Sequence, residues 1–163
     1  MNLLFICTGN TCRSPMAEAI ARAEAARLGL EGVFCASAGV FAVAGQPAAA
    51  PAIAVAGERK IDLTRHRSRE LAPELGEWAD VVLGMSRSHL SGVADVVPDV
   101  ETRLLTEHLP TSDPRHGLAV PDPFGGDLET YEETYRLLER AIRGLFDDLF
   151  PAGAEPRTGH LGG

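Results

Sequence analysis

The chain has 163 residues, of which 45% are hydrophobic and 23% are charged, and its formal net charge is −8. This length and composition predict one globular domain, and the acidic balance argues against a nucleic-acid-binding protein. The sequence contains 3 cysteines. Because an odd number makes a poor disulfide framework, we expect a reducing, cytoplasmic environment.

The first predicted element is a strand at residues 2–7. Its apolar run LLFI is typical of a central parallel strand covered on both faces, and it is far too short to cross a membrane. A polar loop follows at residues 8–11. The dipeptide Ser14-Pro15 then predicts the start of an Ala-rich helix, which we expect to end at about Leu28, just before Gly29.

Strands and helices alternate along the rest of the chain. We expect a second strand, an Ala-rich helix, a short helical or turn segment, a third strand and a short helix at residues 33–36, 46–59, 71–77, 80–85 and 86–91. Either 93–97 or 103–105 supplies the fourth strand. A long amphipathic helix begins at Asp127, where apolar side chains recur every three or four residues.

This alternation predicts an α/β layer fold with a parallel sheet, in a single domain that covers residues 1–150. From residue 151 to residue 163 the composition shifts to proline, glycine and alanine, which predicts a disordered C-terminal tail. No internal repeat and no linker divides the sequence.

The loop between the first strand and the first helix, CTGNTCRS at residues 7–14, carries the predicted chemistry. At the carboxyl edge of a parallel sheet, the amides of such a loop converge on one anion, and the helix N-terminus adds positive potential. Gly9 and Asn10 tolerate a positive φ, so successive N–H groups point inward, and Arg13 closes the ring with a bidentate fork. We therefore predict a phosphate-binding loop made of Thr8, Gly9, Asn10, Thr11, Cys12, Arg13 and Ser14.

Cys7 lies at the foot of this loop, where the positive potential and a hydrogen bond from Ser14 stabilise a thiolate. A thiolate beneath a bound phosphoryl group is placed for in-line attack, and the amides stabilise the equatorial oxygens in the transition state. The Gly-x4-Gly-Lys-Ser/Thr loop of nucleotide triphosphatases is absent from the sequence. The pattern predicts a metal-independent phosphatase that forms a cysteinyl-phosphate intermediate.

The run FICTGNTCRSPMAEAI, residues 5–20, resembles the start of the low-molecular-weight protein tyrosine phosphatase family. The resemblance continues to about residue 150, through SAG at 37–39, HRSR at 66–69, residues 80–85 and DPFG at 122–125. It implies a three-layer fold with a four-stranded parallel sheet in the order 2-1-3-4, flanked by helices on both faces. It also implies that no metal and no organic cofactor takes part.

Carried over residue by residue, the resemblance makes Cys7 the nucleophile, Arg13 a phosphate ligand and Asp122 the general acid. An acid is needed because a leaving group departs poorly as an anion, and such a group typically contributes about 10²- to 10⁴-fold in rate. Asp113, which also precedes a proline, is a rival acid, but it lacks the Phe-Gly-Gly that follows Asp122-Pro123. The residues that match the family's loop-supporting network are Asn10, Ser14, Ser37 and His66.

Cys12 shares the tight loop with the nucleophile. Oxidation can join Cys7 and Cys12 in a disulfide, which would shield Cys7 from irreversible over-oxidation, and the family resemblance supports this at the matching position. The competing interpretation is that Cys12 is a passive small side chain.

The side chains expected around the phosphate-binding loop decide which phosphorylated residue we predict as substrate. Family members that act on phosphotyrosine place a bulky aliphatic residue at the position of Thr11 and tyrosines after the Asp-Pro. Here Thr11, Phe124 and the segment around Phe41 resemble the bacterial branch that acts on phosphoarginine in proteins. Thr11 narrows the wall and offers a hydroxyl, which favours a slim guanidinium over a flat phenol ring. We predict phosphoarginine, with phosphotyrosine as the alternative, and selectivity residues Thr11, Phe41 and Phe124.

Two other classes of protein share parts of this pattern. An arsenate reductase can use the same loop and fold, but it needs further cysteines to pass a disulfide outward, and none follows Cys35. A non-catalytic phosphate-binding module keeps the loop but does not need Asp122. We expect phosphorylated proteins as partners, no nucleic acid, no membrane, and a monomer.

Overall fold

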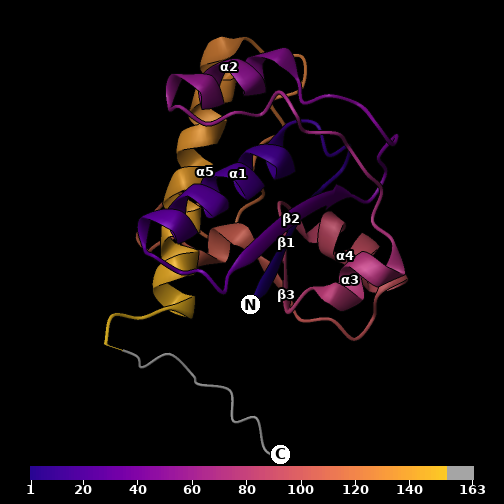
Figure 1. Cartoon of the computed structure of the whole chain (residues 1–163), viewed down its shortest axis with the longest axis vertical. Helices are drawn as coiled ribbons and strands as arrows, with labels where there is room; N and C mark the ends of the chain where they lie inside the picture. The colour runs from indigo at the N-terminus through magenta and orange to yellow at the C-terminus, as the bar shows by residue number, and fades with distance from the viewer. Residues whose placement is uncertain (154–163) are drawn as a thin grey trace, which may run out of the picture.

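The computed structural model describes residues 1–153, so residues 154–163 of the predicted tail lie outside the described residues. At its centre is a parallel sheet of 4 strands in the spatial order β2-β1-β3-β4, which confirms the expected order (Figure 1). The strands are β1 (Asn2–Cys7), β2 (Phe34–Gly39), β3 (Val81–Gly84) and β4 (Thr102–Leu104).

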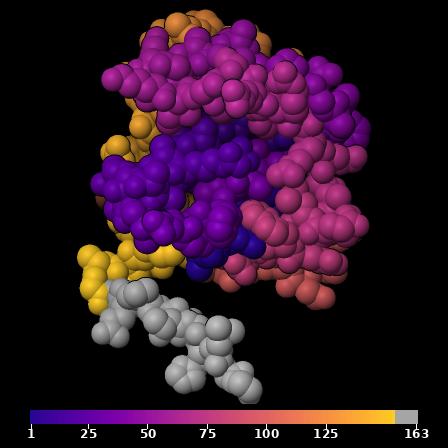
Figure 2. Space-filling model, viewed as in Figure 1, coloured from indigo at the N-terminus to yellow at the C-terminus, as the bar shows by residue number. Residues whose placement is uncertain are grey.

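Helices cover both faces of the sheet, which gives the expected three layers. In Figure 1, α1, α2 and α5 lie on one side of the strands, and α3 and α4 lie on the other. Figure 2 shows the indigo α1 region in the middle of one face of the molecule, with the magenta α2 region above it. The helices are α1 (Arg13–Arg27), α2 (Ala50–Glu58), α3 (Pro73–Trp78), α4 (Arg87–Val96), the 3-10 helix η1 (Leu105–His108) and α5 (Leu128–Leu149).

Strand β1 is buried on both faces, as its continuous apolar run predicts. Leu3 and Phe5 belong to the core that α1 and α5 cover, whereas Leu4 and Ile6 belong to the smaller core on the α4 side. All four side chains are inaccessible to solvent. Burying each such side chain contributes about 1.5–3 kcal/mol, so β1 is fixed from both sides. The loop that follows β1 therefore starts from a rigid support.

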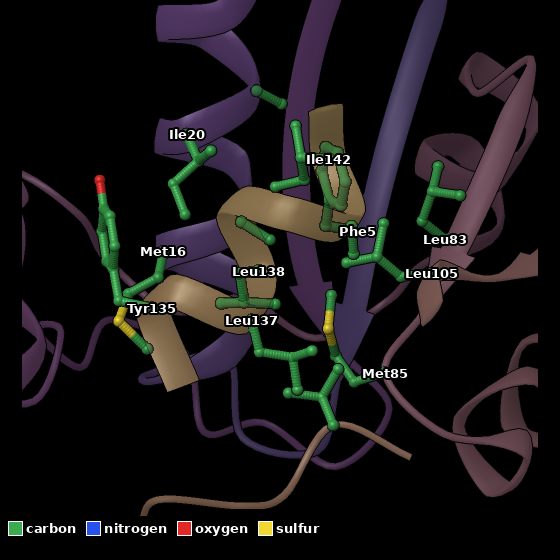
Figure 3. Packing of buried hydrophobic residues seen from close by; sticks show 14 of the residues in the cluster. Phe5, Met16, Ile20, Leu83, Met85, Leu105, Tyr135, Leu137, Leu138 and Ile142 are labelled. Carbon is green, nitrogen blue, oxygen red and sulfur yellow. The ribbon is translucent and has the colours of Figure 1, made fainter. Parts of the chain in front are cut away.

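The predicted amphipathic stripe of α5 faces the core. Asp127 caps the helix, and its carboxylate accepts a hydrogen bond from the amide of Thr130 at 2.9 Å. Figure 3 shows Tyr135, Leu138 and Ile142 of this helix packed beside side chains of α1 and β1. The cap and the stripe together fix the segment that follows Asp122 in the sequence.

Hydrogen bonds to distant segments explain two predicted boundaries that are wrong. The second strand continues past residue 36 to Gly39, because its pairing with β1 extends as far as Cys7. The Ala-rich helix begins at Ala50 and not at residue 46. Residues 46–49 instead bond to other loops: the amide of Gln46 donates to Ser68 Oγ at 2.9 Å, and that of Ala49 donates to the carbonyl of Thr11 at 2.9 Å.

The fourth strand is the later of the two candidates, because β4 covers Thr102–Leu104. The earlier candidate, 93–97, lies mostly in α4, which is longer than the short helix expected at 86–91. Ser86 caps this helix by accepting a hydrogen bond from the amide of His89 at 3.3 Å. Within residues 1–153, no helix is both long enough and apolar enough to cross a membrane.

Candidate active site

A cavity of about 250 Å³ opens at the carboxyl end of β1. Its wall is formed by the predicted loop together with Asp122 and Phe124, which arrive from more than a hundred residues later in the sequence. The structure thus brings the predicted nucleophile, arginine and acid to one cavity. The lining residues are Cys7, Thr8, Gly9, Thr11, Cys12, Arg13, Asp122 and Phe124.

Asn10 lies beneath this wall and holds the loop in shape. Its φ is 55°, the left-handed conformation that the sequence predicts, and its side chain is inaccessible to solvent. The Nδ2 group donates to Ser14 Oγ at 2.9 Å and to Ser37 Oγ at 3.0 Å, and Oδ1 accepts from the amide of Arg69 at 3.0 Å. The side chain of Asn10 therefore joins the loop to β2 and to the segment before α3.

His66 also supports the loop, as its match to the family network implies. Its Nε2 lies 2.7 Å from the carbonyl oxygen of Asn10. Burial lowers the pKa of His66 below its ordinary value. Arg69 was missed by sequence reasoning: its Nε donates to the carbonyl of Ser37 at 3.0 Å. Only its place in the quoted HRSR run pointed to it.

The sulfur of Cys7 lies at the floor of the cavity, 2.9 Å from Ser14 Oγ. Cys7 is only 3% exposed, so a ligand reaches it from one direction. On the neighbouring strand, a Cβ built at Gly39 would overlap the carbonyl oxygen of Thr8. A glycine is therefore required where β2 passes behind the loop.

Arg13 and Asp122 face each other across the cavity. Arg13 Nη1 donates to the carbonyl of Val120 at 3.0 Å, and Nη2 lies 3.7 Å from Asp122 Oδ2. The Arg13 side chain is 8% exposed and the Asp122 side chain 54% exposed. The guanidinium is thus nearly buried at the cavity wall, whereas the carboxylate is largely open to solvent. The rival acid, Asp113, does not line the cavity.

The sulfur of Cys12 lies 3.2 Å from the hydroxyl of Tyr131, which comes from α5. Burial raises the pKa of the Cys12 thiol, and the pKa of the Tyr131 hydroxyl is raised by burial and then by this contact. The two groups therefore remain protonated together at neutral pH. Tyr131 belongs to the amphipathic helix that the sequence predicts, but no local motif reveals its contact with the loop.

His89 is another residue that the sequence did not single out. Its Nε2 lies 2.9 Å from Oγ1 of Thr8, and it is only 4% exposed. A lone histidine on a helix carries no sequence signal, since its partner lies 81 residues away. Among residues 1–153, no group of three His, Cys, Asp or Glu side chains is arranged to hold a metal ion.

Two aromatic side chains stand out at the surface near the loop. Phe124 is 78% exposed and lines the cavity, which suits its predicted contact with substrate. Phe41 is 83% exposed, and its amide donates to the carbonyl of Thr8 at 3.0 Å, although it does not line the cavity itself. The main chain of Phe41 therefore lies against the loop.

Residues 2–152 match the family described as low molecular weight phosphotyrosine protein phosphatase, and the chain belongs to this family. A protein-arginine-phosphatase of Bacillus subtilis is 41% identical over 151 residues, which cover 91% of this chain and 97% of that protein. The low molecular weight protein-tyrosine-phosphatase Etp of Escherichia coli is 34% identical over 142 residues, 86% of this chain and 88% of that protein.

Solved structures give the same result. The YwlE arginine phosphatase, solved as a cysteine-to-serine mutant with a phosphorylated active site serine, superposes with a TM-score of 0.84. It is 39% identical to this chain, and the match covers 94% of this chain and 98% of that one. The fold expected from the resemblance is therefore confirmed at the level of the family and its structures.

Proposed function

We propose that this chain is a cysteine-dependent protein phosphatase that hydrolyses phosphoarginine in proteins. The observation that carries the proposal is the cavity in which the Cys7 sulfur lies below Arg13 and Asp122. The similarity to protein-arginine-phosphatases over nine tenths of the chain supports the choice of substrate.

In the first step, the amides of the loop and the guanidinium of Arg13 bind the phosphoryl oxygens. Arg13 is already held by the carbonyl of Val120, so little conformational freedom is lost when phosphate binds. The Cys7 thiolate attacks phosphorus while the bond from phosphorus to the leaving nitrogen breaks. The loop donors stabilise the charge that develops on the equatorial oxygens.

Asp122, in its carboxylic acid form, gives its proton to the leaving guanidino nitrogen. The resulting carboxylate then takes a proton from water, whose oxygen attacks the phosphocysteine. The sulfur–phosphorus bond breaks, inorganic phosphate leaves, and the Cys7 thiolate is restored. The exposure of Asp122 at the cavity mouth suits this role, because both the leaving group and the water must reach it.

The cavity wall favours phosphoarginine over phosphotyrosine. Thr11 lines the cavity with a β-branched, polar side chain. After the Asp-Pro, where phosphotyrosine-directed members have tyrosines whose rings can stack on the substrate, this chain has Phe124 and then two glycines. While its O–H donates to the leaving nitrogen, the carbonyl oxygen of the Asp122 carboxyl group also accepts from the further N–H groups of a guanidinium, which a phenol lacks. Phosphotyrosine remains the second candidate because a related Escherichia coli protein is named for it.

The test compares kcat/KM on matched phosphoarginine and phosphotyrosine peptides. We expect wild type to favour phosphoarginine, and Thr11→Ile to shift the ratio toward phosphotyrosine by about tenfold, the discrimination typical of one methyl-sized change in a pocket. Thr111→Ile is the matched control, since Thr111 is exposed and does not line the cavity. An unchanged ratio in Thr11→Ile would refute the selectivity argument, and turnover by Cys7→Ser would refute the mechanism.

The other two classes fit the site less well. Within residues 1–153, Cys7, Cys12 and Cys35 are all free and buried. An arsenate reductase needs further cysteines that pass a disulfide outward, and no cysteine follows Cys35 in the sequence. A binding module has no use for a carboxylate at the mouth of the phosphate cavity.

We further propose a cytoplasmic monomer whose partners are phosphorylated proteins. The unpaired cysteines fit a reducing compartment. Cys7 and Cys12 line the same cavity, which supports the proposed disulfide between them after oxidation by a hydroperoxide. Light scattering tests the oligomeric state.

A further inference from the structure

His89 occupies the first turn of α4, on the opposite side of the sheet from α1 and α5. Its ring is buried, and the single hydrogen bond that the ring makes within residues 1–153 joins Nε2 to Oγ1 of Thr8 at 2.9 Å. Thr8 lines the cavity, whereas His89 does not. The imidazole therefore reaches the site only through the hydroxyl of Thr8.

The imidazole is neutral near pH 7. Burial, and after it the charge of Arg13, lower the pKa of His89 to about 4, against the opposing charge of Asp122. A neutral imidazole carries one N–H, which is either on Nδ1 or on Nε2.

The surroundings of Nδ1 decide which of the two nitrogens carries the proton. Nδ1 is buried and has no hydrogen-bond partner in the described part of the chain. A buried N–H without a partner is rarer in proteins than an unpaired acceptor, so the proton belongs on Nε2. His89 then donates to Oγ1 of Thr8, and the proton of Thr8 is left free to point into the cavity.

We propose that His89 is a positioning residue that holds the Thr8 hydroxyl as a hydrogen-bond donor to the phosphoryl group. The proposal rests on the proposed phosphatase function only because that function identifies the ligand as a phosphoryl group. It adds a side-chain donor to a loop that otherwise binds phosphate through its amides and Arg13. Without His89, the hydroxyl of Thr8 rotates freely and must lose that freedom when phosphate binds.

The test measures the dissociation constant of inorganic phosphate by calorimetry, which needs no turnover. We expect Thr8→Val to weaken phosphate binding about tenfold, as expected for loss of one hydrogen bond to a charged group, and Thr8→Ser to retain it. His89→Leu should weaken binding about fivefold in the Thr8 protein but have no further effect in Thr8→Val. This lack of additivity is the signature of a residue that acts through Thr8.

His89→Gln provides the rescue, because its amide N–H can reach Thr8, whereas His89→Asn is too short to do so. We expect Gln to stay within about twofold of wild type and Asn to behave as Leu does. If His89→Leu fails to fold, this Gln–Asn pair carries the test. His108→Gln is the matched control, since His108 also has a buried, unpartnered ring nitrogen but contacts Asp148 instead of the loop.

Additive losses in the double variant, or equal losses in Gln and Asn, would overturn the proposal and leave His89 a purely structural residue. Failure of the phosphatase hypothesis looks different. In that case phosphate binding would respond to Thr8 and His89 as described, while the wild-type protein would hydrolyse neither phosphoarginine nor phosphotyrosine peptides.

Discussion

At the scale of single residues, Asn10 connects the phosphate-binding loop to its supporting segments. Its side chain makes three hydrogen bonds, and its carbonyl oxygen contacts His66. None of these contacts reaches a ligand. They hold a positive φ that a residue with a Cβ adopts only at a cost of about 1 kcal/mol, which suitable side-chain hydrogen bonds offset.

Asn10→Ala should therefore lower both stability and activity. We expect a loss of about 2–4 kcal/mol in the free energy of unfolding, because Ser14, Ser37 and the amide of Arg69 lose their partner in a buried site. kcat/KM on phosphoarginine peptides should fall about 100-fold as the loop amides lose their alignment. Urea unfolding and steady-state kinetics measure the two effects.

Asn2→Ala is the control for this prediction, because Asn2 lies at the end of β1 opposite to the loop, where its Nδ2 donates to the carbonyl of Trp78. It should leave kcat/KM unchanged. Wild-type kcat/KM in Asn10→Ala would show that the loop keeps its shape without this side chain.

At the scale of elements, α5 meets η1 at a glycine. A Cβ built at Gly144 would overlap the carbonyl of His108, so the helix approaches this segment at a distance that only glycine allows. The contact closes the core that α5 shares with Leu105 and Leu109.

Gly144→Ala should destabilise the protein by about 1–3 kcal/mol, the usual cost of forcing extra atoms into a packed site, even though alanine is the better helix former. Gly57→Ala in α2 is the matched control. A Cβ at Gly57 meets no atom within 4 Å, so this change should stabilise the protein by up to about 1 kcal/mol. Thermal unfolding of both variants measures these changes in stability. A Gly144→Ala variant more stable than wild type would contradict the close approach of Gly144 to the carbonyl of His108.

Elements whose signal is local were predictable, and those set by distant partners were not. The apolar run before Cys7 predicts a buried strand and the apolar stripe of α5 predicts an amphipathic helix, and both are present. The start of α2 was placed at residue 46, four residues early, because the bonds of Gln46 and Ala49 to other loops leave no trace in the local sequence.

The candidate site divides in the same way. Cys7, Arg13 and Asp122 follow from a loop motif and a resemblance, and the structure brings all three to one cavity. Tyr131 and His89 contact the loop from α5 and α4, at separations of 119 and 81 residues. Such contacts depend on how the layers pack, which neither composition nor periodicity specifies.

At the scale of the whole molecule, stability should depend on pH through His89, which is buried, and His66, which is partly buried. Burial lowers the pKa of His89 to about 4 and also lowers that of His66, from an ordinary value of 6.5. In the unfolded chain both rings take up a proton near pH 6.5. Their neutral folded forms therefore contribute stability above that pH, and the contribution is lost as the pH falls toward 4.

The carboxylates act in a lower window. The pKa values of Asp127 and Glu132 are lowered by hydrogen bonds from Thr130 and from Arg59, so their contributions fade only below their ordinary values near 4. Glu18 has the opposite sign: burial raises its pKa above the ordinary 4.5, so its contribution is present below pH 4.5 and is lost as the pH rises through the raised value. Because Glu18 titrates above pH 4.5, the histidine contribution is isolated by comparing wild type with a variant that lacks one histidine between pH 6.5 and pH 5.

We accordingly expect the free energy of unfolding to fall between pH 6.5 and pH 5, by up to about 1.4 kcal/mol per pH unit for each proton that unfolding takes up. His89→Gln should flatten this slope by the share of one histidine, since glutamine does not titrate. Urea unfolding at half-unit steps of pH measures it. A slope in His89→Gln equal to that of wild type would mean that the imidazole is as readily protonated in the folded protein as in the unfolded chain. That outcome would also remove the neutral ring on which the positioning of Thr8 depends.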